Sequence, residues 1–161
     1  MENENKKQKR VIDFYIFVDY SDYLIGYNII EKGKVPLIIP KIAKFRHYKD
    51  ERHKKTYLLK VKREMESSAL KSLLLKCKIE HIKHNMMLFV EIIEFVKTHG
   101  NCLIFMSVDN NQFNAFMKLL SMIPHEEHII VVKESDIKRK SLEHQLSLII
   151  DTMLNIERMS K

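Results

Sequence analysis

The sequence predicts an α/β fold in which helices pack on one mixed, five-stranded sheet. Three observations lead to this prediction. Runs rich in β-branched and aromatic residues occur early in the 161-residue chain, similar runs later alternate with helical patterns, and 45% of the residues are hydrophobic. The chain holds only three glycines and three prolines, which excludes collagen-like and low-complexity classes. The predicted element order is β-β-β-α-β-α-β-α.

The first half of the chain is predicted to supply three antiparallel strands. Residues 11–19 (VIDFYIFVD) and 23–30 (YLIGYNII) have the composition of buried strands and are separated by a polar break. Residues 35–39 are apolar but bounded by prolines, so they can form an edge strand at best. The charged residues 44–55 are predicted to be a loop or hairpin tip, and residues 56–62 (TYLLKVK) the third strand.

The second half is predicted to alternate helices and strands. A long helix is expected over residues 66–100, with a phase slip in its apolar pattern near its middle. Its second half carries more apolar residues than one stripe needs, which leaves two alternatives, a homodimer interface or deep burial under the sheet. Strands follow at 102–109 and 128–134, with helices at 113–122 and 141–159.

The chain is expected to form one domain over residues 11–161, preceded by a disordered basic tail over residues 1–10. Two cysteines are too few for a disulfide framework, which favours a reducing, cytoplasmic setting. No apolar run reaches the roughly 18 residues of a membrane span, so no membrane partner is expected.

The formal net charge of +7 is concentrated in one segment. Residues 41–63 carry ten Lys or Arg and two acids, a net +8, which leaves the rest of the chain at −1. A nucleic-acid backbone is the predicted partner, because each cation that neutralises a phosphate releases a counterion. The alternative is a solvated, lysine-rich surface. The candidate nucleic-acid contacts are Lys41, Lys44, Arg46, Lys49, Arg52, Lys54, Lys55, Lys60 and Lys62.

Two aspartates lie at the ends of predicted buried strands. Asp19 follows the first apolar run, and Asp109 follows the run CLIFMSV. If these strands are parallel neighbours, both carboxylates meet at the carboxyl end of the sheet, where open α/β sheets bind ligands. Carboxylates brought together repel unless a proton or a cation intervenes, and oxygen ligands suit Mg²⁺ or Mn²⁺. The alternative for each aspartate alone is a helix cap or a turn residue.

The element order and these acids together resemble the ribonuclease H-like superfamily of nucleases, recombinases and transposases, over about residues 11–159. Asp19-Tyr20-Ser21, followed by Gly26-Tyr27-Asn28-Ile29, is similar to the family's first-strand Asp-x-Ser and second-strand Gly-Tyr. Met65-Glu66 resembles the pair that opens the family's first helix. Asp109-Asn110-Asn111-Gln112 resembles the Asp closing its fourth strand. The family's last helix carries a fourth acid, for which this chain offers Glu143 or Asp151.

The resemblance implies a Mg²⁺- or Mn²⁺-dependent nuclease with a two-metal mechanism. Asp19 would bridge both ions, Glu66 and Asp109 would bind one, and Glu143 or Asp151 the other. The implied substrates are RNA–DNA hybrids, DNA or structured RNA. The family's Gly-rich loop after Asp-x-Ser and its histidine before the last helix are both missing here. Two alternatives therefore stay open, a nucleic-acid-binding module without catalysis and a protein-interaction domain.

Overall fold

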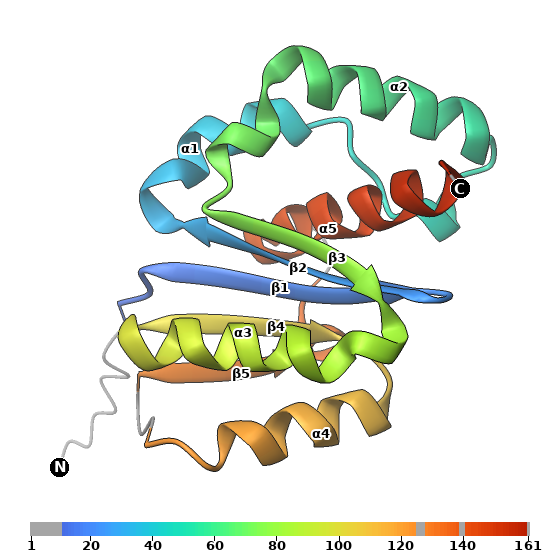
Figure 1. The fold of residues 1–161 in the computed structure, drawn as a ribbon. Coiled ribbons are helices and arrows are strands. Elements are labelled where there is room, and N and C mark those ends of the chain that lie inside the picture. Colours follow the sequence, from blue (N-terminus) through green and yellow to red (C-terminus); the bar gives the residue numbers. More distant parts are fainter. Residues whose placement is uncertain (1–10, 125–127, 139–140, 161) are drawn as a thin grey trace, which may run out of the picture.

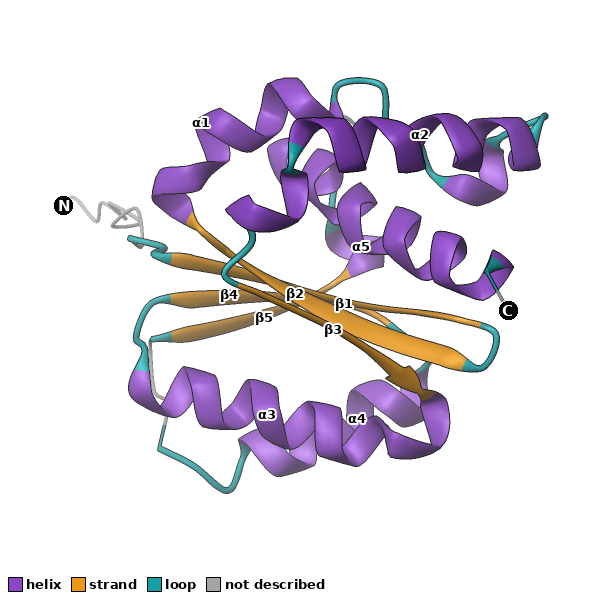
Figure 2. Ribbon diagram, turned by 45° about the horizontal axis from the view of Figure 1, so that its top comes forward, coloured by secondary structure: helices purple, strands orange, loops and turns teal. Residues whose placement is uncertain are grey.

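A five-stranded mixed sheet separates two layers of helices in the computed structural model, which describes residues 11–124, 128–138 and 141–160 (Figure 1). Seen from the second direction, helices α3 and α4 lie on one side of the sheet and α1, α2 and α5 on the other (Figure 2). The α/β class and the five-stranded mixed sheet are confirmed. The basic tail predicted over residues 1–10 lies outside the described residues.

The sheet has the order β3-β2-β1-β4-β5. Strand β1 is central and pairs antiparallel with β2 and parallel with β4, while β2 pairs antiparallel with β3 and β4 pairs parallel with β5. The carboxyl ends of β1, β4 and β5 therefore meet at one end of the sheet. The strand bounds are Phe14–Ser21 (β1), Leu24–Glu31 (β2), Lys76–His81 (β3), Cys102–Ser107 (β4) and Ile129–Lys133 (β5).

Two apolar cores lie on the two faces of the sheet because side chains alternate along each strand. Tyr15 and Phe17 of β1 join the core beneath α5, whereas Ile16 and Val18 join the core beneath α3 and α4. The helix bounds are Val35–Ile38 (α1), Lys54–Ser68 (α2), Asn85–Thr98 (α3), Asn110–Leu120 (α4) and Leu142–Met159 (α5). None of the helices in the described parts of the chain combines the length and apolarity needed to span a bilayer.

The third strand predicted at residues 56–62 is wrong, since this segment lies within α2. Leu58, Val61 and Met65 are buried at helical spacing, while Leu59 is 48% exposed. A strand at this place would instead bury alternate residues. A seven-residue apolar segment is compatible with both periods, and here packing against the α5 face of the sheet decides between them.

The single long helix predicted at residues 66–100 is also wrong. Helix α2 ends at Ser68, Ala69 adopts a left-handed φ of 55°, and strand β3 follows before α3 begins. Strand β3 reads KCKIEH, a short edge strand whose alternation consists of Cys77 and Ile79 alone among charged residues, which is too weak a pattern to separate it from a helix. The apolar half of the predicted helix is α3, most of whose apolar residues are buried. The homodimer through this segment stays a prediction.

Residues 32–75 form an insertion between β2 and β3 that covers α5. The edge strand predicted at residues 35–39 is wrong, because α1 occupies this position with a proline in its first turn, where the missing N–H is not needed. Ile38, Ile42 and Phe45 bury their side chains in the core that contains α5. This anchoring carries residues 44–53 to the carboxyl end of β1, where the next section begins.

Candidate functional site

A polar groove of about 780 Å³ opens at the carboxyl ends of β1, β4 and β5. The β1–β2 turn, the starts of α4 and of the segment after β5, the second half of α5 and the insertion loop all contribute to it. Five acidic side chains and three Lys or Arg side chains line the groove, so the groove is acidic although the protein as a whole is basic. These charged residues are Asp19, Asp22, Asp109, Glu134 and Asp151, with Lys49, Lys133 and Arg158.

Asp19 follows the buried part of β1 and lines the groove. Its Oδ1 accepts a hydrogen bond of 2.8 Å from the backbone N–H of Tyr20. Desolvation, followed by the nearby charge of Asp151, holds the pKa of Asp19 well above its usual range. Glu134 adds to the same effect. A carboxyl group with a raised pKa beside two further acids is a place where a cation would relieve repulsion.

Asp151 approaches the same point from the third turn of α5. It is buried, at 7% exposure, because α5 packs this turn against the sheet. The backbone N–H of Tyr48 donates to its Oδ2 at 3.0 Å, and Nε2 of His47 lies 3.9 Å from its Oδ1. Desolvation raises the pKa of Asp151, and the charge of His47 opposes this shift.

Glu134 follows β5 and completes the group of acids. The hydroxyl of Ser107, at the end of β4, donates to its Oε2, and Nε2 of His47 lies 3.7 Å from its Oε1. The interaction with His47, aided by Ser107, lowers the pKa of Glu134 to about 2. Glu134 in turn raises the pKa of His47. Of the three neighbouring acids, Glu134 is thus the one that the surroundings keep charged.

Asp109 lines the groove at the start of α4. Its Oδ1 accepts a hydrogen bond of 2.8 Å from the backbone N–H of Gln112, so it caps this helix. The side chain of Asp109 therefore both caps α4 and lines the groove.

The structure brings together three of the five acids predicted from the sequence. Asp19, Asp109 and Asp151 line the groove. Glu66 is exposed on α2. Glu143 lies two turns before Asp151, near the far end of β1, where burial and then the charge of Glu143 raise the pKa of Tyr15. Both glutamates lie outside the set of described residues that line the groove. Of the two candidates in the last helix, the geometry favours Asp151.

Sequence reasoning missed Glu134 and His47. Glu134 directly follows the apolar strand β5, as Asp109 follows β4 two residues after its end, so the same strand-end argument could have found it. His47 carries no such signal, because only the path of the insertion brings it to the acids.

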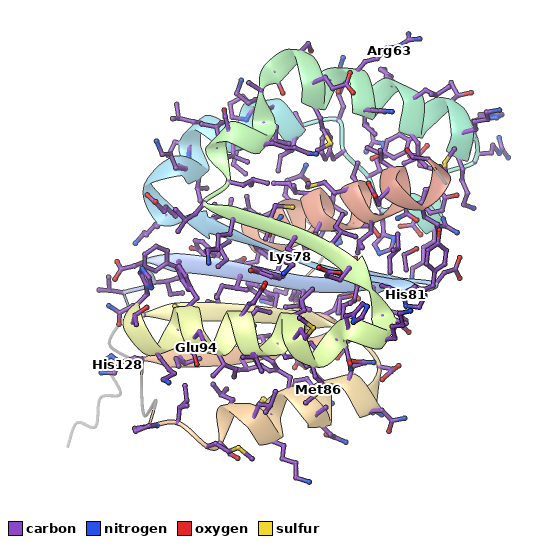
Figure 3. All side chains as sticks on the ribbon, in the orientation of Figure 1. Arg63, Lys78, His81, Met86, Glu94 and His128 are labelled. Carbon is purple, nitrogen blue, oxygen red and sulfur yellow. The ribbon has the colours of Figure 1, made fainter. Side chains whose placement is uncertain are left out.

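The basic segment forms the wall of the groove on the α5 side and the surface beyond it. Lys49 lines the groove itself. Lys44 pairs with Glu64 at 3.9 Å and Arg46 with Glu51 at 3.8 Å, and Lys41 donates to the carbonyl oxygen of Ser68. Arg63 points outward from α2 (Figure 3). The other predicted contacts are exposed along α2 and the loop before it, at Arg52, Lys54, Lys55, Lys60 and Lys62.

The donors in the groove are hard oxygen atoms, the type that Mg²⁺ and Mn²⁺ prefer. Within residues 11–124, 128–138 and 141–160, however, no group of three or more His, Cys, Asp and Glu side chains is already arranged to hold a metal ion. The carboxylate of Asp151 already contacts His47 and Tyr48, and that of Glu134 contacts His47 and Ser107. An ion would have to replace part of these contacts.

A scan against protein-family models and a search among curated proteins found no match for this sequence. The functional assignment therefore depends on the groove and the residues that line it.

Proposed function

We propose that the chain is a metal-dependent nuclease with a ribonuclease H-like fold that hydrolyses phosphodiester bonds by a two-metal mechanism. One observation carries the proposal. Asp19 on the first strand, Asp109 after the fourth strand and Asp151 in the last helix are the elements and acids that the resemblance implies, and all three line one groove. The parallel pairing of β1 with β4 places Asp19 and Asp109 at the same end of the sheet.

Divalent cations held here would supply an activated water and stabilise the charge on the leaving oxygen. Asp19 and Asp151 would hold them, with Asp109 on one side and Glu134 on the other. Glu134 would replace Glu66 as the fourth acid, because Glu134 lines the groove and Glu66 does not. The raised pKa values of Asp19 and Asp151 fit this use, since carboxylates that repel one another bind a cation in place of protons.

The chain's own cations would handle the substrate. Lys49, Lys133 and Arg158 line the groove beside the acids, and the exposed cations of α2 extend this surface. Phosphates of a nucleic acid would pair with them along the strand, which supports nucleic acid as substrate over a small phosphodiester. RNA–DNA hybrids, DNA and structured RNA are the classes to compare.

The test is cleavage of labelled single strands, duplexes, hybrids and a four-way junction with Mg²⁺, with Mn²⁺ and with EDTA. We expect metal-dependent cleavage of at least one substrate. Asp19→Asn and Asp151→Asn should each lower the rate by roughly 100-fold or more. Glu66→Gln and Glu143→Gln are the matched controls and should cut at the parent rate, because neither residue lines the groove. Cleavage that persists in EDTA, or in Asp19→Asn, would refute the proposal.

A nucleic-acid-binding module without catalysis is the second candidate. It is favoured by the finding that the described residues contain no group already arranged for a metal. Binding of Mn²⁺ by the purified protein, followed by isothermal titration calorimetry, separates the two. The nuclease should bind Mn²⁺ and lose this binding in Asp19→Asn, whereas the binding module should show no heat of binding in either protein.

A further inference from the structure

We infer that the groove accepts an unpaired nucleic-acid strand whose bases stack on Tyr20 and Tyr48, one on each side of Asp19. The inference rests on the proposed function for the identity of the substrate as nucleic acid, and it narrows that substrate to a single-stranded segment.

Tyr48 borders the groove on the α5 side. Its backbone N–H is fixed on Asp151, and its ring packs at the edge of the core beneath the insertion. Two cations lie over this ring, Lys54 with Nζ 5.6 Å and Arg158 with Cζ 5.3 Å from the centroid. A base that displaces one of these cations would stack on the ring of Tyr48, and the displaced cation would then pair with the phosphate of that base.

Tyr20 borders the groove on the other face of the sheet. It follows Asp19 directly, and successive residues of a strand point to opposite faces, so its ring lies on the α4 side while the Asp19 carboxyl lies on the α5 side. The side chain is 38% exposed and lines the groove. An aromatic ring this exposed next to Asp19 is available for base stacking.

Base stacking on these tyrosines requires an unpaired strand. The loop residues His47 and Tyr48 contact the acids directly, with N–O distances of 3.7 Å to Glu134, 3.9 Å to Asp151 and 3.0 Å to Asp151. Bases inside a duplex are already stacked and paired, so a tyrosine next to the cleaved phosphate could stack only on a base freed from its partner. Two such tyrosines flanking Asp19 fit a strand that enters unpaired.

Binding without cleavage tests this inference. Fluorescence anisotropy in EDTA compares a fluorescein-labelled 12-nucleotide single strand with a duplex of the same sequence, at low salt, where electrostatic affinity is strongest. We expect the single strand to bind more tightly. Tyr20→Leu and Tyr48→Leu should each weaken its binding by roughly 5- to 150-fold, the effect of losing one stacked base.

Matched variants separate stacking from folding. Tyr20→Phe and Tyr48→Phe keep the ring and should bind like the parent. Tyr23→Leu is the position control, because Tyr23 is 36% exposed in the same turn but is not among the described residues that line the groove. Circular dichroism melting checks that each variant is folded.

The outcomes are distinguishable from those of the nuclease test. Tighter binding of the duplex, or Leu variants that bind like the Phe variants, would overturn the single-strand inference even if metal-dependent cleavage is found. Tyrosine-dependent binding of the single strand with no cleavage would support the inference and refute the nuclease proposal.

Discussion

Replacing Gly26 by alanine should both destabilise the fold and disturb the groove. Gly26 lies in β2 directly opposite Asp19 of β1. A Cβ atom built there would lie 3.0 Å from Cγ1 of Ile79, 3.1 Å from the carbonyl oxygen of Lys78 and 3.2 Å from Cδ1 of Ile150. One neighbour belongs to the β3 backbone and cannot rotate away, so the strand or α5 must move.

Overpacking of this kind costs about 1–3 kcal/mol. For a chain of 161 residues, this corresponds to a fall in melting temperature of roughly 2–10 °C. Thermal unfolding followed by circular dichroism at neutral pH measures it. Gly33→Ala is the matched control, because nothing lies within 4 Å of a Cβ atom at that position. Its melting temperature should equal or slightly exceed that of the parent.

The same substitution should reduce activity by more than the loss of stability explains. Ile150 precedes Asp151, so a shift of α5 away from Gly26 moves Asp151 relative to Asp19. Cleavage rates are compared well below the melting temperature, where both proteins are folded. If Gly26→Ala melts within about 1 °C of the parent, the close approach of β2, β3 and α5 described above is incorrect.

Three further substitutions and one set of cations give independent tests. Asp19→Asn should raise the melting temperature at pH 7 by a few degrees. The raised pKa of Asp19 means that the folded state loses stability as pH rises and this carboxyl ionises, so the gain from Asp19→Asn should vanish near pH 4. A melting temperature of the variant below that of the parent at pH 7 would contradict this reasoning. Glu134→Gln should lower the free energy of unfolding by about 1 kcal/mol at neutral pH. The parent loses this contribution as pH falls from about 5 toward 2. The free energy of unfolding, measured by urea denaturation across this range, should therefore vary less with pH in the variant than in the parent. Asp109→Asn should melt like the parent because asparagine also caps helices, yet cut more slowly, whereas equal cutting would limit Asp109 to its cap role. Lys54, Lys55 and Lys62 are exposed cations of α2, and replacing them by glutamine should weaken the salt dependence of nucleic-acid binding. If the slope of log affinity against log salt concentration does not change, α2 is not part of the interface.

Elements with one dominant period could be predicted from the sequence. Strands β1, β2, β4 and β5 and helix α5 lie within a few residues of their predicted places, because their apolar runs are long and bounded by polar breaks. Helix α2 and strand β3 could not be predicted in the same way. The first has an apolar run that suits either period, and the second is a short, charged edge strand whose pairing depends on β2.

The site residues that could be predicted are likewise those on elements with a clear periodicity. Asp19 and Asp109 could be located because they end predictable strands, and Asp151 was one of two alternatives whose choice depends on how far α5 runs along the sheet. Glu66 was assigned to the start of a helix that in fact begins twelve residues earlier, at Lys54. His47 could not be assigned by any local pattern, since its neighbours in space come from β5 and α5.

The insertion that carries His47 and Tyr48 leaves and rejoins the sheet at almost the same place. The backbone N–H of Leu75, at its end, donates to the carbonyl oxygen of Ile29 in β2 at 2.8 Å, and that of Lys32, at its start, donates to Asp13 at 2.9 Å. Because both ends are fixed to neighbouring strands, the segment between them can change in length or sequence without altering the strand order. The wall that would select the substrate and the sheet that positions the acids can therefore diverge independently in evolution.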